Sequence, residues 1–204
     1  MSFGRKGSEA NGYKFSQKGG CMKLGTKLSG VLASVLLTFL ISPVSAEEFK
    51  TRLSGYQETP LTINSNGSGE FTAKIVEQTG VVIAIDYELT YRDLSSDVQQ
   101  AHIHFGRPAI SGQIILFLCT NLTPPTGVPT PQKCPLVGPA TITGTLTAAN
   151  VIARPTQGID GGTAGFAQII EAMRVDAAYV NVHTANFTGG EIRGTLPGQG
   201  NDDR

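Results

Sequence analysis

Apolar and polar side chains alternate with a period of two along residues 81–91, and this pattern restricts the segment to a β-strand. Successive side chains of a strand point to opposite faces, so every second residue can lie in a core. One face of the predicted strand carries only large apolar residues: Val81, Ile83, Ile85, Tyr87, Leu89 and Tyr91. The opposite face carries Asp86, Glu88 and Thr90. The pattern therefore predicts a long strand with one buried face.

Short segments with the same strand character continue along the chain. Residues 71–75 alternate in the same way, and residues 78–80 predict a short hairpin connection to the strand that follows. Residues 114–118 are apolar on both sides, as in a central strand. The other candidate strands are residues 49–53, 101–106, 141–147, 179–184 and 191–196. Because turn-forming residues separate about eight short strands, we predict an all-β fold, an antiparallel β-sandwich.

One short helix is expected within this strand pattern. Apolar residues recur at the helical spacing i, i+3, i+4 and i+7, in Phe166, Ile169, Ile170 and Met173. Residues 160–165 form a polar entry, and about three turns fit before the strand that begins at Tyr179. We expect this helix to close one end of the sandwich.

The start of the chain has the layout of an export signal. Lys23 and Lys27 precede an apolar core at residues 31–41, and residues 44–46 are small enough for a signal peptidase site. A membrane span needs ~18–20 apolar residues, and this core is shorter. We therefore expect cleavage after Ala46 rather than anchoring, and no membrane span after cleavage.

The predicted cleavage sets the domain boundaries. Residues 1–46 are the expected signal peptide, with Met22 as the translation start or with the residues before it as a long basic extension. Residues 47–197 form one β-sandwich domain, and the Gly- and Asp-rich residues 198–204 form a flexible tail. The domain is therefore expected to be secreted or periplasmic.

The charge of the exported part argues against a nucleic-acid partner. From residue 47 onwards the chain carries ten basic and fifteen acidic side chains, a net charge of −5. Such a surface offers no large positive field to a phosphate backbone. We expect an extracytoplasmic protein or glycan as the partner, and no nucleic acid.

Two cysteines remain once the leader, with Cys21, is removed. Cys119 and Cys134 are an even pair in an exported domain, which favours a disulfide. Residues 120–133 between them are mostly turn formers, and closing a loop of roughly 15 residues removes about 3 kcal/mol of unfolded-state entropy. The C-x-x-C spacing of many metal and redox sites is absent. The sequence therefore predicts a structural disulfide.

All three histidines of the chain lie in two strand-like motifs. His102 and His104 are two residues apart within residues 101–106, so they share one face of that strand. His183 shares a face of residues 179–184 with Tyr179 and Asn181. If the two strands are neighbours, the three imidazoles converge on one polar patch.

Two hypotheses follow for this patch. In the first, His102, His104 and His183 bind one copper or zinc ion, and Tyr179 or Asn181 fixes a ring tautomer. A structural zinc would lack a fourth protein ligand, so water or a carboxylate would complete the site. In the second, the polar side chains only satisfy one another's hydrogen bonds across neighbouring strands.

The order and spacing of several blocks resemble the CHRD (chordin) domain family over roughly residues 48–196. The blocks are residues 53–60, 67–69, 101–106, 118–119, 144–147, 179–184 and 189–194. The resemblance implies an extracellular β-sandwich module. In chordin-like animal proteins such modules belong to antagonists of secreted growth factors, whereas stand-alone copies behind a signal peptide look like the microbial form.

The motif at residues 101–106 is also similar to a His-x-His-x-Phe-Gly stretch of copper/zinc superoxide dismutases. It lacks the residue between the second histidine and Phe105, and only His183 remains as a further histidine. A bimetallic site cannot be assembled from these residues, so dismutase activity is not expected.

Signatures of other enzyme classes are also missing. The chain has no G-x-S-x-G, H-E-x-x-H, P-loop or dinucleotide fingerprint. Acid–base catalysis would need paired carboxylates, and the candidates are Glu58, Asp86, Glu88 and Glu191. Asp86 and Glu88 lie on a polar strand face, and Glu191 is expected to pair with Arg193 at the surface. We therefore predict a non-enzymatic binding module without a cofactor, with a mononuclear copper or zinc protein as the alternative.

Overall fold

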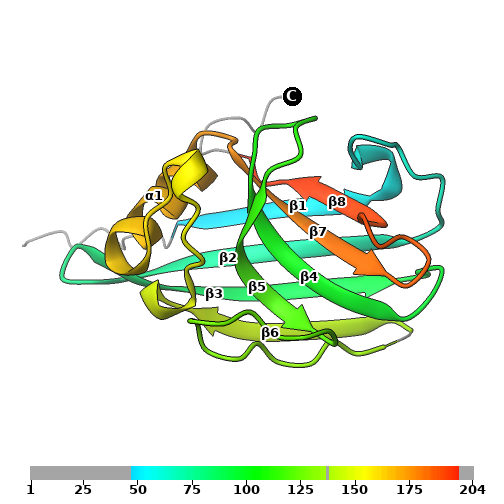
Figure 1. Ribbon diagram of the computed structural model, residues 1–204, viewed down its shortest axis with the longest axis horizontal. Helices are drawn as coiled ribbons and strands as arrows, with labels where there is room; N and C mark the ends of the chain where they lie inside the picture. The colour runs from blue at the N-terminus through cyan, green and yellow to red at the C-terminus, as the bar shows by residue number, and fades with distance from the viewer. Residues whose placement is uncertain (1–46, 137, 198–204) are drawn as a thin grey trace, which may run out of the picture. The chain divides into compact units, whose positions relative to one another are not determined.

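The computed structural model describes residues 47–136 and 138–197, which form a β-rich unit with one α-helix (Figure 1). The predicted leader, its cleavage after Ala46 and the tail at residues 198–204 lie outside the described residues. The strands are β1 (Glu48–Ser54), β2 (Ser68–Gln78), β3 (Val81–Arg92), β4 (Val98–Phe105), β5 (Gln113–Thr120), β6 (Ala140–Leu146), β7 (Ala178–Thr184) and β8 (Ile192–Thr195). The helix α1 (Gly162–Arg174) and the short 3-10 turns η1 (Gly55–Gln57), η2 (Ala148–Asn150) and η3 (Pro155–Gln157) lie in the connections.

The eight strands belong to one antiparallel sheet with the order β5-β4-β7-β8-β1-β2-β3-β6. Its two halves meet at a corner where β1 and β8 pair only through Ser54 and Arg193. The sheet turns there, so the halves face each other across a common core, and the edge strands β5 and β6 come into contact (Figure 1). The fold is therefore all-β, as predicted, and both layers come from a single, nearly closed sheet.

The alternation in β3 supplies much of this core. Ile85 and Leu89 are fully buried, and on the neighbouring strand β2 they lie opposite Ile75 and Phe71. Burying one such side chain stabilises the fold by about 1.5–3 kcal/mol. Tyr87 lies in the same row, and its hydroxyl donates to the carbonyl oxygen of Leu118 at 2.7 Å. The hydrogen bond joins β3 to β5 across the core and satisfies the one polar atom of this side chain.

The prediction is wrong at the start of β3, where Val81 and Ile83 are 58% and 44% exposed. A register shift between Val76 and Glu77 of β2 leaves an extra residue in β3, which is a β-bulge. Because side chains alternate with a period of two, one inserted residue moves all positions before it to the other face.

Helix α1 packs its apolar stripe into the core, as its spacing predicts. The buried side chains of the stripe are Phe166, Ile169, Ile170 and Met173. The helix lies at one end of the sheet (Figure 1), and the backbone nitrogen of Ala177 donates to the carbonyl of Ala172 where β7 begins. Among the described residues, no helix has the length and apolar character needed to cross a membrane.

Strand β7 is covered on both faces, and every residue of it is buried. Val180 and Val182 belong to the core on the inner face. Loops cover the outer face, because Glu58, Thr188 and Gly112 contact the side chains of Asn181, His183 and Tyr179 there. A strand whose polar face is also buried is unusual, and this face carries the candidate site.

Candidate metal centre

The three histidines lie side by side on the outer face of β4 and β7. These strands are antiparallel neighbours, with His102 opposite Asn181 and His104 opposite Tyr179. His183 follows two residues after Asn181, so it projects from the same face beside His102. The pairing of β4 with β7 therefore brings together three imidazoles that are far apart along the chain.

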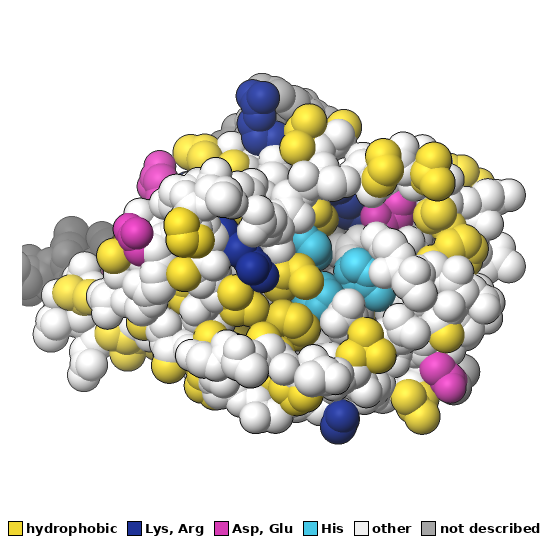
Figure 2. All heavy atoms as spheres, viewed as in Figure 1, with side chains coloured by type: hydrophobic (Ala, Val, Ile, Leu, Met, Phe, Trp, Pro, Cys, Tyr) yellow, Lys and Arg dark blue, Asp and Glu magenta, His cyan; other side chains and the backbone are white. Residues whose placement is uncertain are grey.

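The rings are close enough to share one ligand. One nitrogen can be chosen from each ring so that all three atoms lie within 4.8 Å of one another. The ring centroid of His102 lies 5.4 Å from that of His104 and 4.9 Å from that of His183. His102 is fully buried, and the other two side chains are 7% exposed. Figure 2 shows the histidines in a recess on this face of the molecule.

Backbone carbonyls fix the orientation of two rings. The Nδ1 atom of His104 lies 3.0 Å from the carbonyl oxygen of Gly112, and Nδ1 of His183 lies 2.9 Å from that of Thr188. A carbonyl oxygen only accepts hydrogen bonds, so both Nδ1 atoms must carry the proton. In the neutral ring the lone pair is then on Nε2, which is the tautomer that a metal-ligating histidine needs.

The remaining ring nitrogens have no protein partner within the described part of the chain. These buried atoms are Nε2 of His104, Nε2 of His183 and both nitrogens of His102. Leaving a buried polar atom unpaired costs about 1–3 kcal/mol, so four such atoms in one recess call for a physical reason. The hypothesis that the patch only satisfies its own hydrogen bonds is therefore not supported by the contacts between these residues.

The recess also keeps the three rings neutral. Burial lowers the pKa of His104 to about 4, against a smaller opposing effect of its bond to Gly112. Burial likewise lowers the pKa of His183, and the pKa of His102 falls well below its usual value because of burial and then the neighbouring His183 and His104. Neutral imidazoles carry the lone pair that metal binding requires.

Aromatic rings enclose the imidazoles. Phe117 of β5 meets His102 edge-on at a centroid distance of 4.4 Å, and Tyr179 stacks on His104 at 4.7 Å. The guanidinium carbon of Arg193 lies 3.4 Å from the centroid of the Tyr179 ring. A cation, a phenol and an imidazole thus form one stack beside the histidine cluster.

A buried polar network that the sequence did not predict adjoins the site. The Nδ2 atom of Asn181 donates to the Glu58 carboxyl at 2.6 Å, while Asn181 Oδ1 has no partner among the described residues. Burial raises the pKa of Glu58 to about 7, although a backbone bond at Thr59 and the charge of Arg193 both oppose the shift. Arg193 donates to the Thr59 hydroxyl and to the carbonyl of Ile110. Asn181 therefore supports the loop that holds Glu58.

The predicted pairing of Glu191 with Arg193 is wrong. Glu191 precedes β8 and is fully buried, and it accepts hydrogen bonds from Ser65, Ser95 and Thr184. These bonds outweigh the effect of burial and lower its pKa. The carboxylate thus ties three segments together and lies outside the histidine cluster.

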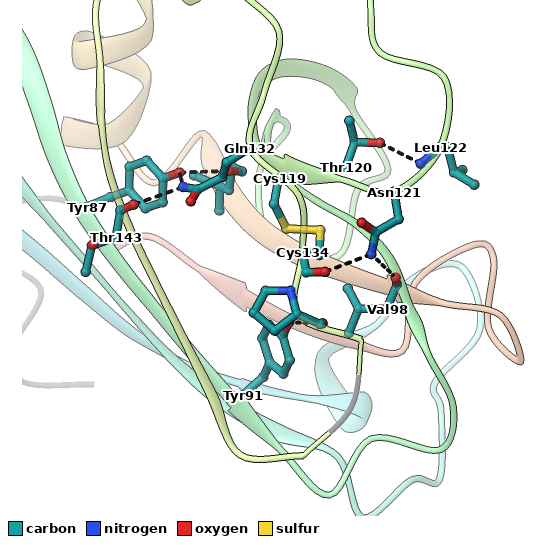
Figure 3. The surroundings of a disulfide bond; sticks show 12 residues. Tyr87, Tyr91, Val98, Cys119, Thr120, Asn121, Leu122, Gln132, Cys134 and Thr143 are labelled. Carbon is teal, nitrogen blue, oxygen red and sulfur yellow. Dashed lines mark hydrogen bonds between the residues drawn. A yellow bond between two sulfur atoms is a disulfide. The ribbon is translucent and has the colours of Figure 1, made fainter.

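The predicted disulfide is confirmed. Cys119 at the end of β5 is bonded to Cys134, and both side chains are buried (Figure 3). The Nδ2 atom of Asn121 donates to the carbonyls of Val98 and Cys134 at 2.8 and 2.9 Å. Gln132 of the enclosed loop donates to the Tyr87 hydroxyl. The loop is therefore held against the sheet at both ends.

Comparison with known proteins identifies a domain family. The family model described as CHRD domain matches residues 49–196, nearly the whole described unit. No curated protein and no solved structure matches the chain. Because the match covers most of the sequence, the chain belongs to the CHRD domain family.

Proposed function

We propose that this CHRD domain is a secreted or periplasmic binding module that holds one transition-metal ion, copper or zinc, on His102, His104 and His183. Export is supported by the predicted leader, by the disulfide and by the extracellular character of CHRD domains. The family supports a binding role. A protein or glycan partner stays a prediction.

The unpaired Nε2 atoms carry the proposal. The Nδ1 atoms of His104 and His183 donate hydrogen bonds to backbone carbonyls. The Nε2 atoms of these two rings are unpaired, as are both nitrogens of His102. A ligating histidine characteristically donates its other ring N–H to a carbonyl or carboxylate. A metal ion bound by one nitrogen of each ring would supply a partner for three of these four unpaired nitrogens.

The dimensions of the cluster suit a single ion. Copper and zinc both accept neutral imidazole, with metal–nitrogen bonds of about 2.0–2.1 Å. Three such ligands lie about 3.3–3.6 Å from one another around the ion. The nitrogens are within 4.8 Å of one another, so the rings must approach by little more than an ångström. His183 lies on the same sheet face as His102 and His104, which the proposal requires.

Metal titration of the exported protein tests this proposal. The full chain is expressed without an affinity tag, recovered after export, freed of metal and titrated with Cu(II) or Zn(II). We expect one ion per chain, and no tight binding in the His104→Gln and His183→Gln variants. Glu70→Gln is the control, because it introduces the same residue at an exposed pair with Arg52 outside the histidine cluster. Binding that survives in both histidine variants would refute the proposal.

A further inference from the structure

The donor set of the cluster is neutral. Within the described ranges, the group consists of three histidines and includes no carboxylate or thiol. The buried carboxyl of Glu58 is engaged by Asn181, and Glu191 by serine and threonine hydroxyls. Cys119 and Cys134 form a disulfide, so neither offers a thiolate ligand. The protein ligands would therefore cancel none of the charge of a bound ion.

Positive charge lies close to the cluster. The Arg193 guanidinium stacks on Tyr179, which in turn stacks on His104. Arg154 approaches from the other side, where its Nε donates to the carbonyl of Ile114 at 2.6 Å. Ile114 lies opposite His104 in the pairing of β4 with β5, so this hydrogen bond places Arg154 near the cluster. In this partly buried recess a doubly charged ion is opposed about twice as strongly as a singly charged one.

The coordination numbers of the candidate ions also disfavour a divalent ion at this site. Zn(II) takes four ligands, and Cu(II) prefers four in a tetragonal arrangement, so each needs at least one donor beyond the three imidazoles. Cu(I) has a filled d shell and accepts three nitrogens in a plane. Phe117 and Tyr179 pack against two of the rings, so the imidazoles lie among aromatic side chains.

We infer that the site is selective for monovalent copper, bound by Nε2 of His104, Nε2 of His183 and one nitrogen of His102, without a protein anion. This inference rests on the proposed function, and it adds the identity and oxidation state of the ion. It follows from the neutral donor set, the two guanidinium groups and the enclosed geometry.

Competition under anaerobic conditions tests the selectivity. Metal-free, tag-free protein is titrated with Cu(I) against a chromophoric Cu(I) chelator, and separately with Zn(II) against a zinc chelator. We expect Cu(I) to bind at least about 100-fold more tightly than Zn(II). Zn(II) binding of equal or greater strength would overturn the inference while leaving the proposed function intact. Histidine-independent binding of both ions would overturn the proposed function as well.

The Arg154→Gln variant tests whether the positive charge of Arg154 disfavours a divalent ion in the site. Glutamine keeps an N–H donor for the carbonyl of Ile114 and removes the charge. We expect Zn(II) affinity to rise several-fold, by up to about tenfold, and Cu(I) affinity to rise less. Arg92→Gln is the matched control, because its side chain is 66% exposed and pairs with Asp93. Equal gains for both ions in the Arg154 variant would contradict the inference.

Discussion

The ring of Tyr179 lies parallel to the imidazole of His104, with 9° between the planes and 4.7 Å between the centroids. Gly112 links the two side chains, because its N–H donates to the Tyr179 hydroxyl and its carbonyl accepts from Nδ1 of His104. The tyrosine therefore positions the loop residue that fixes the histidine tautomer.

Replacement of Tyr179 by phenylalanine is expected to weaken metal binding about tenfold, as losses of outer hydrogen bonds to metal ligands typically do. The stack on His104 is kept, but the bond from Gly112 is lost. Chelator competition measures the effect. Tyr56→Phe is the control, since Tyr56 is 68% exposed and its hydroxyl donates to Asn64. An unchanged affinity in Tyr179→Phe would show that this hydrogen bond does not support the site.

The Glu58→Gln variant is expected to be more stable than the wild type at pH 8 and equally stable near pH 4.5. The folded pKa of Glu58 is raised from 4.5 to about 7, so the unfolded chain releases the proton first as pH rises. Wild-type stability therefore falls through this window, by about 3 kcal/mol for a group buried to this degree. Urea unfolding of metal-free protein at both pH values measures the difference. A difference that does not change with pH would contradict this assignment.

Glu191→Gln is expected to destabilise the fold by about 2–4 kcal/mol at pH 7, because an amide cannot accept all the hydrogen bonds of the buried carboxylate. The folded pKa of Glu191 is lowered, so its contribution is present above the unfolded pKa and is lost as pH falls through the folded value. The gap between variant and wild type should therefore shrink on acidification. Glu70→Gln, which affects only an exposed pair with Arg52, should cost less than about 0.5 kcal/mol. Equal costs for both variants would refute the role of Glu191.

Replacement of both Cys119 and Cys134 by serine should lower the free energy of unfolding by about 3 kcal/mol and leave the domain folded. The disulfide closes a loop with a sequence separation of 15, and hydrogen bonds of Asn121 and Gln132 still hold that loop. Urea unfolding measures the loss. Thiol labelling of the unfolded, unreduced exported protein should detect no free thiol, and two labelled cysteines would contradict the disulfide.

The sequence was sufficient for the features that depend on local pattern. The alternation along residues 81–91 predicts the burial of Ile85, Tyr87 and Leu89, and the helical spacing from Phe166 to Met173 predicts α1. The bulge that exposes Val81 and Ile83 could not be predicted, because it depends on how β2 pairs with β3.

The candidate site was only partly accessible from the sequence. Two strand motifs predict which faces carry His102, His104 and His183, but the pairing of β4 with β7 is a long-range property. The loops that cover this face could not be predicted either. Arg193 is bonded to Thr59, and Glu191 to Ser65, across more than half of the chain. No local pattern encodes such contacts, so the spacing of Glu191 and Arg193 predicts a surface pair that does not form.

X-ray absorption spectroscopy of the copper-loaded, exported protein tests the central claim most directly. The account predicts three imidazole nitrogens at about 2.0 Å around one copper ion per chain, with the outer-ring scattering typical of histidine. In the His183→Gln variant this signature should be reduced or lost. A shell made of oxygen atoms alone, or a spectrum that is identical in the variant, would contradict the assignment of His102, His104 and His183 as a metal centre.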